Sequence, residues 1–498
     1  MAWLAACAAA GAAAPLGWAP SGWWHVAIAG YAVLALCAAR TRHVGSAGLA
    51  GLAFGLGLHL TGHGWAYEAL HRQAGVPVPA AAAATLLFVL YLALFTAVPC
   101  LAWGALRQRT GRGAWAALPA LLVLGEMARG VPFNGFTSLT LGYALIDTPW
   151  AGLAPVAGVY ALSLVGLAIA AGLAWAATAP GARLWKVGAV SLASAAAGAL
   201  LQSMAWVQPF GTPMRYALVQ TNVAQEDKFR AETQAAQMRR SLHALTTQAA
   251  TLVVTPETAL PVMLADLPAD AVAELRGFVE RSGSHVMLGI ATTSAQGRGH
   301  NSVVHVPPHG AVWQQYHKVR LMPFGEYDPA GFGWFGNELD IALKDLTPGP
   351  PDQPPFVLEH DGWLQRIGTL ICHEELGSGE ALRWASAGPQ AASVLINPSN
   401  LAWFDGSAAI AQRHQIARMR ALEAGRPVLR VANTGITAHI DERGRVLRAL
   451  PLQQEAVLAG SVQGMQGQTP LTRWREWPVL MICAALVLGA AARRPRRA

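Results

Sequence analysis

The sequence predicts a membrane protein in two parts: a polytopic α-helical membrane domain with eight transmembrane helices, and an α/β domain outside the bilayer. Of the 498 residues, 53% are hydrophobic and 13% are charged, whereas soluble domains carry roughly 25% charged residues. The apolar residues concentrate in 1–207 and 477–492, and residues 208–470 hold most of the acidic side chains. Within 208–470, short β-branched runs alternate with amphipathic helical patterns, which is typical of an α/β fold.

Apolar runs of transmembrane length divide the chain. A helix that crosses a bilayer needs about 20 mostly apolar residues. Seven such runs precede the α/β segment and one follows it. We therefore expect a membrane domain over 1–207, an α/β domain over 208–470, and a C-terminal transmembrane helix with a basic tail over 471–498. The predicted spans are roughly 3–19, 22–39, 44–61, 81–106, 114–130, 152–178, 187–207 and 477–492.

Basic residues in the connecting loops indicate how these spans are oriented. They follow every second span, and the loops on the other side carry little basic charge. Because cytoplasmic loops are enriched in Lys and Arg, both termini should lie in the cytoplasm and residues 208–470 outside it. The placement of the +8 net charge in loops also argues against a nucleic-acid-binding surface. The basic residues are Arg40, Arg42, Arg107, Arg109, Arg112, Arg183, Lys186, Arg493, Arg494, Arg496 and Arg497.

In the α/β domain, apolar strands alternate with helices, which predicts sheets covered by helices. Ligand sites in such folds lie at the carboxyl ends of strands, and Glu257 and Cys372 each follow such an end. The predicted strands are 215–220, 251–255, 285–291, 365–371, 392–397, 427–432 and 437–441. The predicted helices are 226–248, 269–281, one from about 374, and 408–424.

Three side chains supply the parts for acyl transfer through a thioester. Cys372 is the only cysteine of residues 208–470, so it has no disulfide partner within that segment. Its place between a strand and a helix start would stabilise a nucleophilic thiolate. Glu257 is the candidate base, with a pKa expected to be raised by burial, and Lys318 could stabilise an oxyanion. Alone, each has a plainer explanation: a packed thiol, a capping carboxylate and a solvated amine.

No metal or cofactor is expected at this site. The sequence has no Cys and His spacing typical of zinc, and no glycine-rich phosphate-binding loop. The thiol, the carboxylate and the amine would then carry the chemistry by themselves.

Longer motifs surround the three residues. They are P-E-T-A-L-P, H-K-V-R-L-M-P-F-G-E-Y, I-C-H-E, S-N-L-A-W-F and R-M-R-A-L-E-A-G-R-P. With these motifs the chain resembles the nitrilase (carbon–nitrogen hydrolase) superfamily, in which a Glu-Lys-Cys triad occurs in this order. Within it the chain is similar to the apolipoprotein N-acyltransferase family. The resemblance covers essentially the whole chain and implies a nitrilase-like αββα sandwich.

The resemblance also implies a two-step reaction in the inner membrane of a Gram-negative bacterium, with the catalytic domain in the periplasm. Cys372 would take an acyl chain from a phospholipid and pass it to the α-amino group of a diacylglyceryl-cysteine at the N-terminus of an apolipoprotein. Glu257 would be the general base and Lys318 would stabilise the tetrahedral intermediate. Glu326 and Glu374 would support the site. We expect a monomer without a cofactor.

Four further residues are candidates for binding substrate: Trp334, Phe335, Trp403 and His373. Trp334 and Phe335 lie in a glycine-rich segment, 328–340, which we expect either to gate lipid entry or to form a packed loop. The chain also departs from the family pattern at three positions. His373 stands in place of a tyrosine, Leu401 in place of an acidic residue, and Phe229 in place of a tryptophan.

Two other functions remain open on the sequence. The first is a membrane-bound nitrilase-type amidase that hydrolyses an amide substrate with the same triad. One anchor would be enough for that activity, so eight spans argue against it. The second is a non-catalytic lipid-binding or transport protein. That function would require a polar pathway through the spans, yet Glu126 is the main ionisable residue near a span centre.

Overall fold

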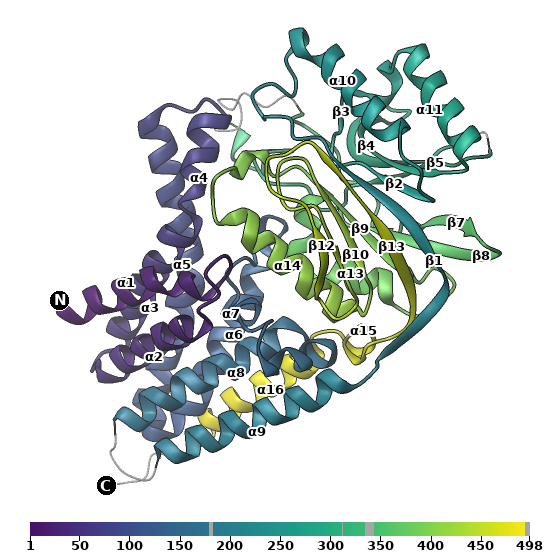
Figure 1. Cartoon of the computed structure of the whole chain (residues 1–498). Coiled ribbons are helices and arrows are strands. Elements are labelled where there is room, and N and C mark those ends of the chain that lie inside the picture. Colours follow the sequence, from purple (N-terminus) through teal and green to yellow (C-terminus); the bar gives the residue numbers. More distant parts are fainter. Residues whose placement is uncertain (179–182, 311, 334–342, 494–498) are drawn as a thin grey trace.

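The computed structural model describes residues 1–178, 183–310, 312–333 and 343–493 of the chain. A bundle of helices forms one part of the molecule and a sheet-containing domain forms the other (Figure 1). The bundle and the short helices beside it comprise α1 (Ala2–Ala13), α2 (Trp24–Arg40), α3 (Val44–His63), α4 (Trp65–Glu68), α5 (Val78–Thr110), α6 (Ala117–Arg129), α7 (Leu141–Ala144), α8 (Ala154–Ala177), α9 (Leu184–Ser203), α15 (Pro470–Trp474) and α16 (Trp477–Ala491).

Each of the eight predicted spans contains a helix, but the helices differ in length. Four stretches are long and apolar enough to cross a membrane: Val44–His63, Val78–Thr110, Pro149–Ala177 and Leu184–Ser203. Ala2–Gly17, Trp24–Arg40 and Trp477–Ala491 are apolar but shorter. In the fifth predicted span, a 3-10 turn precedes α6, which itself has 13 residues. The number of crossings therefore stays a prediction.

The second part contains two sheets. One has seven strands in the order β13-β1-β2-β4-β5-β6, with β3 paired to β4, and the other has the order β12-β11-β10-β9-β8-β7. Their bounds are β1 (Val207–Gln220), β2 (Leu252–Val254), β3 (Leu260–Met263), β4 (His285–Thr293), β5 (Gly299–Val306), β6 (Gln314–His317), β7 (Phe356–His360), β8 (Trp363–Thr369), β9 (Val394–Ser399), β10 (Val428–Ala432), β11 (Ala438–Ile440), β12 (Val446–Ala449) and β13 (Ala456–Gly467).

The two sheets pack face to face and helices cover their outer faces, which gives the expected αββα sandwich (Figure 1). Alternation along β1 shows how the layers form. Tyr216 and Leu218 enter the core shared with the second sheet, whereas Ala217 and Val219 enter a core on the outer face. Because successive side chains of a strand point to opposite faces, one strand contributes to both cores. The covering helices are α10 (Ala231–Thr246), α11 (Ala269–Ser282), α13 (Ser378–Ala385) and α14 (Ala409–Ala424).

Several predicted elements differ from those observed. The strand predicted over 215–220 already starts at Val207, because this stretch pairs with β13. The helix predicted from 226 starts at Ala231, after a turn. The helix expected from about 374 is a 3-10 turn, Cys372–Leu376, followed by α13. Six strands were not predicted: β3, β5, β6, β7, β12 and β13.

Hydrogen bonds join the loop between α6 and α7 to the sandwich. The Asn134 side chain donates to the carbonyl oxygen of Leu321 at 2.9 Å, and the Thr137 hydroxyl donates to that of Leu376 at 2.5 Å. Leu376 ends the 3-10 turn that begins with Cys372. The predicted membrane domain therefore touches the chain segments that carry the candidate triad.

Candidate active site

The three triad candidates come from three strand ends. Glu257 follows β2, Lys318 follows β6, and Cys372 follows β8. Glu257 and Lys318 are only 5% and 2% exposed. The fold thus places a carboxylate and an amine, drawn from separate segments, in a buried position where charges need partners.

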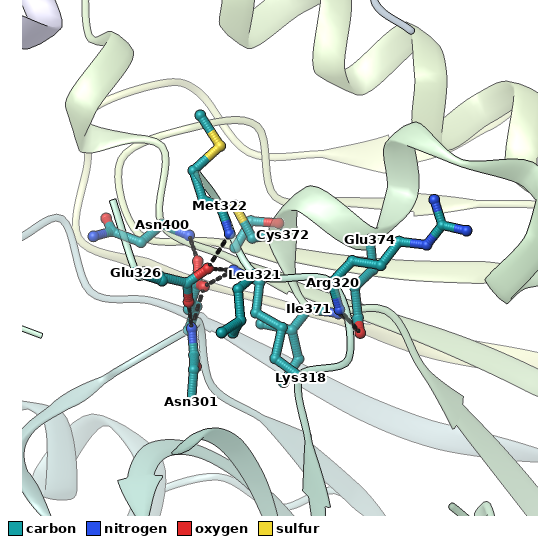
Figure 2. Close-up of polar contacts among 12 residues, drawn as sticks. Asn301, Lys318, Arg320, Leu321, Met322, Glu326, Ile371, Cys372, Glu374 and Asn400 are labelled. Carbon is teal, nitrogen blue, oxygen red and sulfur yellow. Dashed lines mark hydrogen bonds and ion pairs between the residues drawn. The ribbon is translucent and has the colours of Figure 1, made fainter. Parts of the chain in front are cut away.

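Glu257, Lys318, Glu326 and Asn301 form one hydrogen-bonded network. Lys318 Nζ lies 2.9 Å from Glu257 Oε1 and 2.8 Å from Glu326 Oε2. The Asn301 amide donates to the same Glu257 oxygen at 2.7 Å and to Glu326 Oε1 at 2.6 Å. Figure 2 shows Asn301 and Lys318 converging on Glu326. One ammonium is therefore held between two carboxylates, and one amide bridges them.

The network fixes the charge of Glu257. Burial alone raises the pKa of the Glu257 carboxyl, but the Lys318 ammonium and donors from Lys318, Asn400 and Asn301 outweigh it and leave the pKa below its ordinary value. The expected raised pKa is therefore wrong. Burial disfavours the charged form of Lys318, yet the two carboxylates raise its pKa. Glu257 is thus ionised and available as a base.

Cys372 occupies a strained position. It has a φ of 46° and is the first residue of the 3-10 turn, and positive φ is uncommon for residues other than glycine. Its surroundings raise the thiol pKa to about 12, because burial and the Glu257 carboxylate outweigh the favourable charges of Lys318 and Arg413. The resting side chain is therefore a thiol that needs a base before it can attack a carbonyl.

Glu374 connects the Cys372 turn to the segment that carries Lys318. The carboxylate accepts hydrogen bonds from Ile371 N at 2.6 Å, Val319 N at 2.7 Å and the Tyr316 hydroxyl at 2.9 Å. Glu374 has no exposed surface, and burial raises its pKa to about 7. These hydrogen bonds join the start of the Cys372 turn to the chain segment on either side of Lys318.

Sequence reasoning missed several site residues. Asn400 N donates to Glu257 Oε2 at 2.8 Å, and its place in the S-N-L-A-W-F motif was the available signal. Asn301 lies on a strand that was not predicted. Lys228 falls in a segment predicted as a helix, where a lysine is expected to be solvated. It is instead 3% exposed, and its Nζ donates to the Glu257 carbonyl oxygen at 3.1 Å.

The candidate substrate-binding residues have separate locations. Trp334 and Phe335 lie outside the described residues, and so does most of segment 328–340. His373 is buried in the Cys372 turn, and burial holds its pKa well below the usual value, so its ring is neutral. Trp403 packs against a small apolar cluster of Ala74, Val76 and Ala81, as do Tyr67 and Leu70. Tyr67 and Leu70 follow α3, so Trp403 lies at the junction of the two parts.

In the part of the chain that the structure describes, no group of three or more His, Cys, Asp or Glu side chains could hold a metal ion. The triad candidates themselves supply a thiol, an ionised carboxylate and an ammonium. This combination supports nucleophilic attack on a carbonyl carbon.

Known proteins resemble the chain over nearly its full length. Residues 10–173 match the apolipoprotein N-acyltransferase N-terminal domain, and residues 215–470 match the carbon-nitrogen hydrolase family. The apolipoprotein N-acyltransferase of Ralstonia nicotianae is 38% identical over 486 residues, which is 97% of this chain and 91% of that protein. That of Nitrosomonas europaea is 37% identical over 497 residues, which is 98% of this chain and 97% of that protein.

Among solved structures, an amidase from Nesterenkonia sp. aligns with a TM-score of 0.37 and 20% identity, over 52% of this chain and 94% of that chain. This likeness is too low to say anything about the substrate. The sequence relatives, by contrast, include both the helical part and the sandwich. The chain belongs to the apolipoprotein N-acyltransferase family.

Proposed function

We propose that the chain moves a fatty acyl group from a membrane phospholipid to the α-amino group of the N-terminal diacylglyceryl-cysteine of apolipoproteins, through a thioester on Cys372. The observation that carries the proposal is the buried pair of Glu257 and Lys318, whose side-chain atoms lie 2.9 Å apart and whose charges both act on the Cys372 thiol. It occurs in a chain whose relatives are named apolipoprotein N-acyltransferases.

In the first half-reaction, Glu257 takes the thiol proton and the Cys372 thiolate attacks the ester carbonyl of the phospholipid. A C–S bond forms, and the carbonyl electron pair moves to oxygen, where the Lys318 ammonium stabilises it. When the intermediate collapses, the ester C–O bond breaks. The proton held by Glu257 then passes to the departing alkoxide, which leaves as a lysophospholipid and frees Glu257 for the second step.

In the second half-reaction, the α-amine of the diacylglyceryl-cysteine attacks the thioester carbonyl. A C–N bond forms, the C–S bond breaks with its electron pair on sulfur, and Glu257 relays a proton from the amine to the thiolate. The two substrates use one site in turn, which is a ping-pong mechanism. Glu326 and Glu374 support it by holding Lys318 and the Cys372 turn.

A location at the membrane also supports a lipid donor. The loop that carries Asn134 and Thr137 hydrogen-bonds to the segments that follow Lys318 and Cys372. We infer a multi-pass protein of the bacterial inner membrane with eight crossings, both termini in the cytoplasm and the catalytic domain in the periplasm. The domain limits are 1–207, 208–470 and 471–498. An amidase acting on a soluble amide would gain nothing from this arrangement.

The proposal is tested by incubating the purified protein with phospholipid alone. We expect an acyl adduct on Cys372 by mass spectrometry, which hydroxylamine removes and a diacylated lipopeptide discharges. Glu257→Gln should slow its formation by about 10²–10⁴-fold, since a general base contributes that much. Lys318→Ala should slow both half-reactions. Acyl transfer at the parental rate by Cys372→Ala would refute the mechanism, and hydrolysis without transfer would favour the amidase.

A further inference from the structure

A buried arginine contacts the nucleophilic sulfur from a helix that the mechanism above does not use. Arg413 lies in the first half of α14, and its Nη2 is 3.8 Å from Cys372 Sγ. The residue is only 8% exposed. A guanidinium cannot lose its proton under ordinary conditions, so it places a permanent positive charge beside the thiol.

The guanidinium is fixed in place from its other side. Arg413 Nε lies 2.6 Å from Glu375 Oε1, and the Glu375 side chain is 1% exposed. Arg430, fully buried, pairs with the second oxygen of Glu375 and also donates to the Asn397 side chain. Asn397 in turn donates to the Leu370 carbonyl oxygen at 2.6 Å, just before the Cys372 turn. These contacts orient Arg413 before any substrate arrives, so little reorganisation is needed during the reaction.

The charges around the sulfur come from several elements. Glu257 after β2 and Glu375 in the turn itself are negative, while Lys318 after β6 and Arg413 on α14 are positive. Lys228, between β1 and α10, also interacts with the thiol electrostatically. Lys318 already forms ion pairs with two carboxylates, those of Glu257 and Glu326. Arg413 is the cation whose hydrogen bond reaches the sulfur itself.

We propose that Arg413 is a further catalytic residue, whose guanidinium stabilises the Cys372 sulfur whenever that sulfur carries negative charge. This inference rests on the proposed function. In the first half-reaction the sulfur is negative before the C–S bond forms. In the second it becomes negative again as that bond breaks and the electron pair returns to it. Arg413 would thus assist nucleophile and leaving group, whereas Lys318 serves the carbonyl oxygen.

The test measures the thiolate without any lipid. Iodoacetamide alkylates Cys372 through its thiolate, so the rate below the thiol pKa reports the thiolate fraction. The full-length protein in detergent is alkylated between about pH 6 and pH 9, and mass spectrometry follows the peptide that contains Cys372. An opposite charge within about 4–6 Å shifts a pKa by about 1–3 units. Arg413→Gln should therefore lower the rate at least about tenfold at each pH.

Two further variants separate this role from simple pairing with Glu375. Arg418→Gln, on the same helix, removes a guanidinium that pairs with Asp147 at an exposed position, and should leave the rate unchanged. The double variant Glu375→Gln with Arg413→Gln removes the carboxylate that Arg413 neutralises, and should stay at least about fivefold slower than the parent. Recovery of the parental rate in the double variant would overturn the inference, as would a parental rate in Arg413→Gln.

The outcome is independent of the acyl-transfer assay. If alkylation is slowed in Arg413→Gln but the parent protein forms no lipid adduct, the proposed function is refuted and the role of the guanidinium beside the sulfur stands. If the parent protein forms the lipid adduct but Arg413→Gln is alkylated at the parental rate, only the role of Arg413 is refuted.

Discussion

The Glu374 side chain holds two segments of the candidate site, and its protonation state makes that contact sensitive to pH. Its pKa is raised by burial from an ordinary 4.5 to about 7. Between these values the folded chain keeps a proton that the unfolded chain has lost. The stabilisation of the folded state that comes from this bound proton is therefore fully present below about pH 4.5 and is lost as the pH rises to about 7.

Glu374→Gln should destabilise the protein. At about pH 5 Glu374 is a carboxylic acid, and both of its oxygens can still accept from Ile371 N and Val319 N, whereas the NH₂ group of Gln would face one of these donors without an acceptor. Losing a buried acceptor costs about 1–3 kcal/mol. We expect a lower melting temperature in detergent at about pH 5, with a gap to the parent that narrows toward about pH 7. Glu232→Gln, at an exposed position of α10, is the control. If Glu374→Gln and the parent have the same melting temperature at about pH 5, Glu374 does not hold the turn.

At the scale of single residues, strand ends and motifs in the sequence mark Glu257, Lys318 and Cys372 as triad candidates, and the structure brings two of them, Glu257 and Lys318, into one ion pair. The pKa of Glu257 could not be predicted, because the ion pair that reverses the effect of burial joins segments 61 residues apart in the chain. Arg413 was missed for a related reason. In sequence it is one of several polar residues of the predicted helix 408–424, and only the packing of α14 against the Cys372 turn brings it to the sulfur.

At the scale of elements, α14 also anchors the catalytic domain to the helical bundle. Gly158 has a φ of 77°, which breaks the helical path of α8 and leaves Val159 N free to bond elsewhere. Glu423, near the end of α14, accepts that N–H at 2.7 Å and pairs with Arg420 Nη1 at 3.1 Å. Arg420 in turn donates to the Tyr143 hydroxyl at 3.0 Å. One turn of α14 thus connects to two elements of the bundle.

Glu423→Ala should weaken this junction strongly. It leaves the buried Arg420 charge without its carboxylate and Val159 N without its acceptor, and breaking a buried pair costs about 3–5 kcal/mol. Glu423→Gln, which keeps an acceptor, should cost less. Melting temperatures in detergent test whether Glu423→Ala loses more stability than Glu423→Gln. The matched control is Glu442→Ala, because its pair with Arg443 at 3.6 Å is partly exposed and such pairs contribute about 0–1 kcal/mol. Equal losses for Glu423→Ala and Glu442→Ala would contradict the role of the junction.

The strands that could be predicted are buried and mostly apolar; β5 is also buried, but its Gly, His, Asn and Ser residues gave no apolar run. β2, β4, β9 and β10 are buried along almost their whole length, and each contains a run of apolar residues in the sequence. β12 is exposed throughout, and β7 alternates buried with more exposed positions. Such edge strands form because a neighbour supplies their hydrogen bonds, and no local pattern reports that pairing.

At the scale of the whole molecule, the sequence could predict two parts and an αββα sandwich, because hydropathy and motifs extend over long stretches. It could not predict how the parts meet. The contacts of Asn134 with Leu321 and of Thr137 with Leu376 depend on a loop within the bundle, in which Asn134 has a φ of 62°. Those contacts place the site beside the bundle, which is where a donor lipid would have to arrive.

The orientation of the whole molecule is the last prediction. Cytoplasmic loops are enriched in Lys and Arg, and the basic loops of this chain follow every second predicted span. Arg240 is an exposed residue of α10 and Arg109 is an exposed residue at the end of α5. In a variant without its native cysteines, Arg240→Cys should react with a membrane-impermeant maleimide once the outer membrane is permeabilised. Arg109→Cys should react only after the inner membrane is opened. The reverse pattern would place the catalytic domain in the cytoplasm, where the proposed periplasmic reaction could not occur.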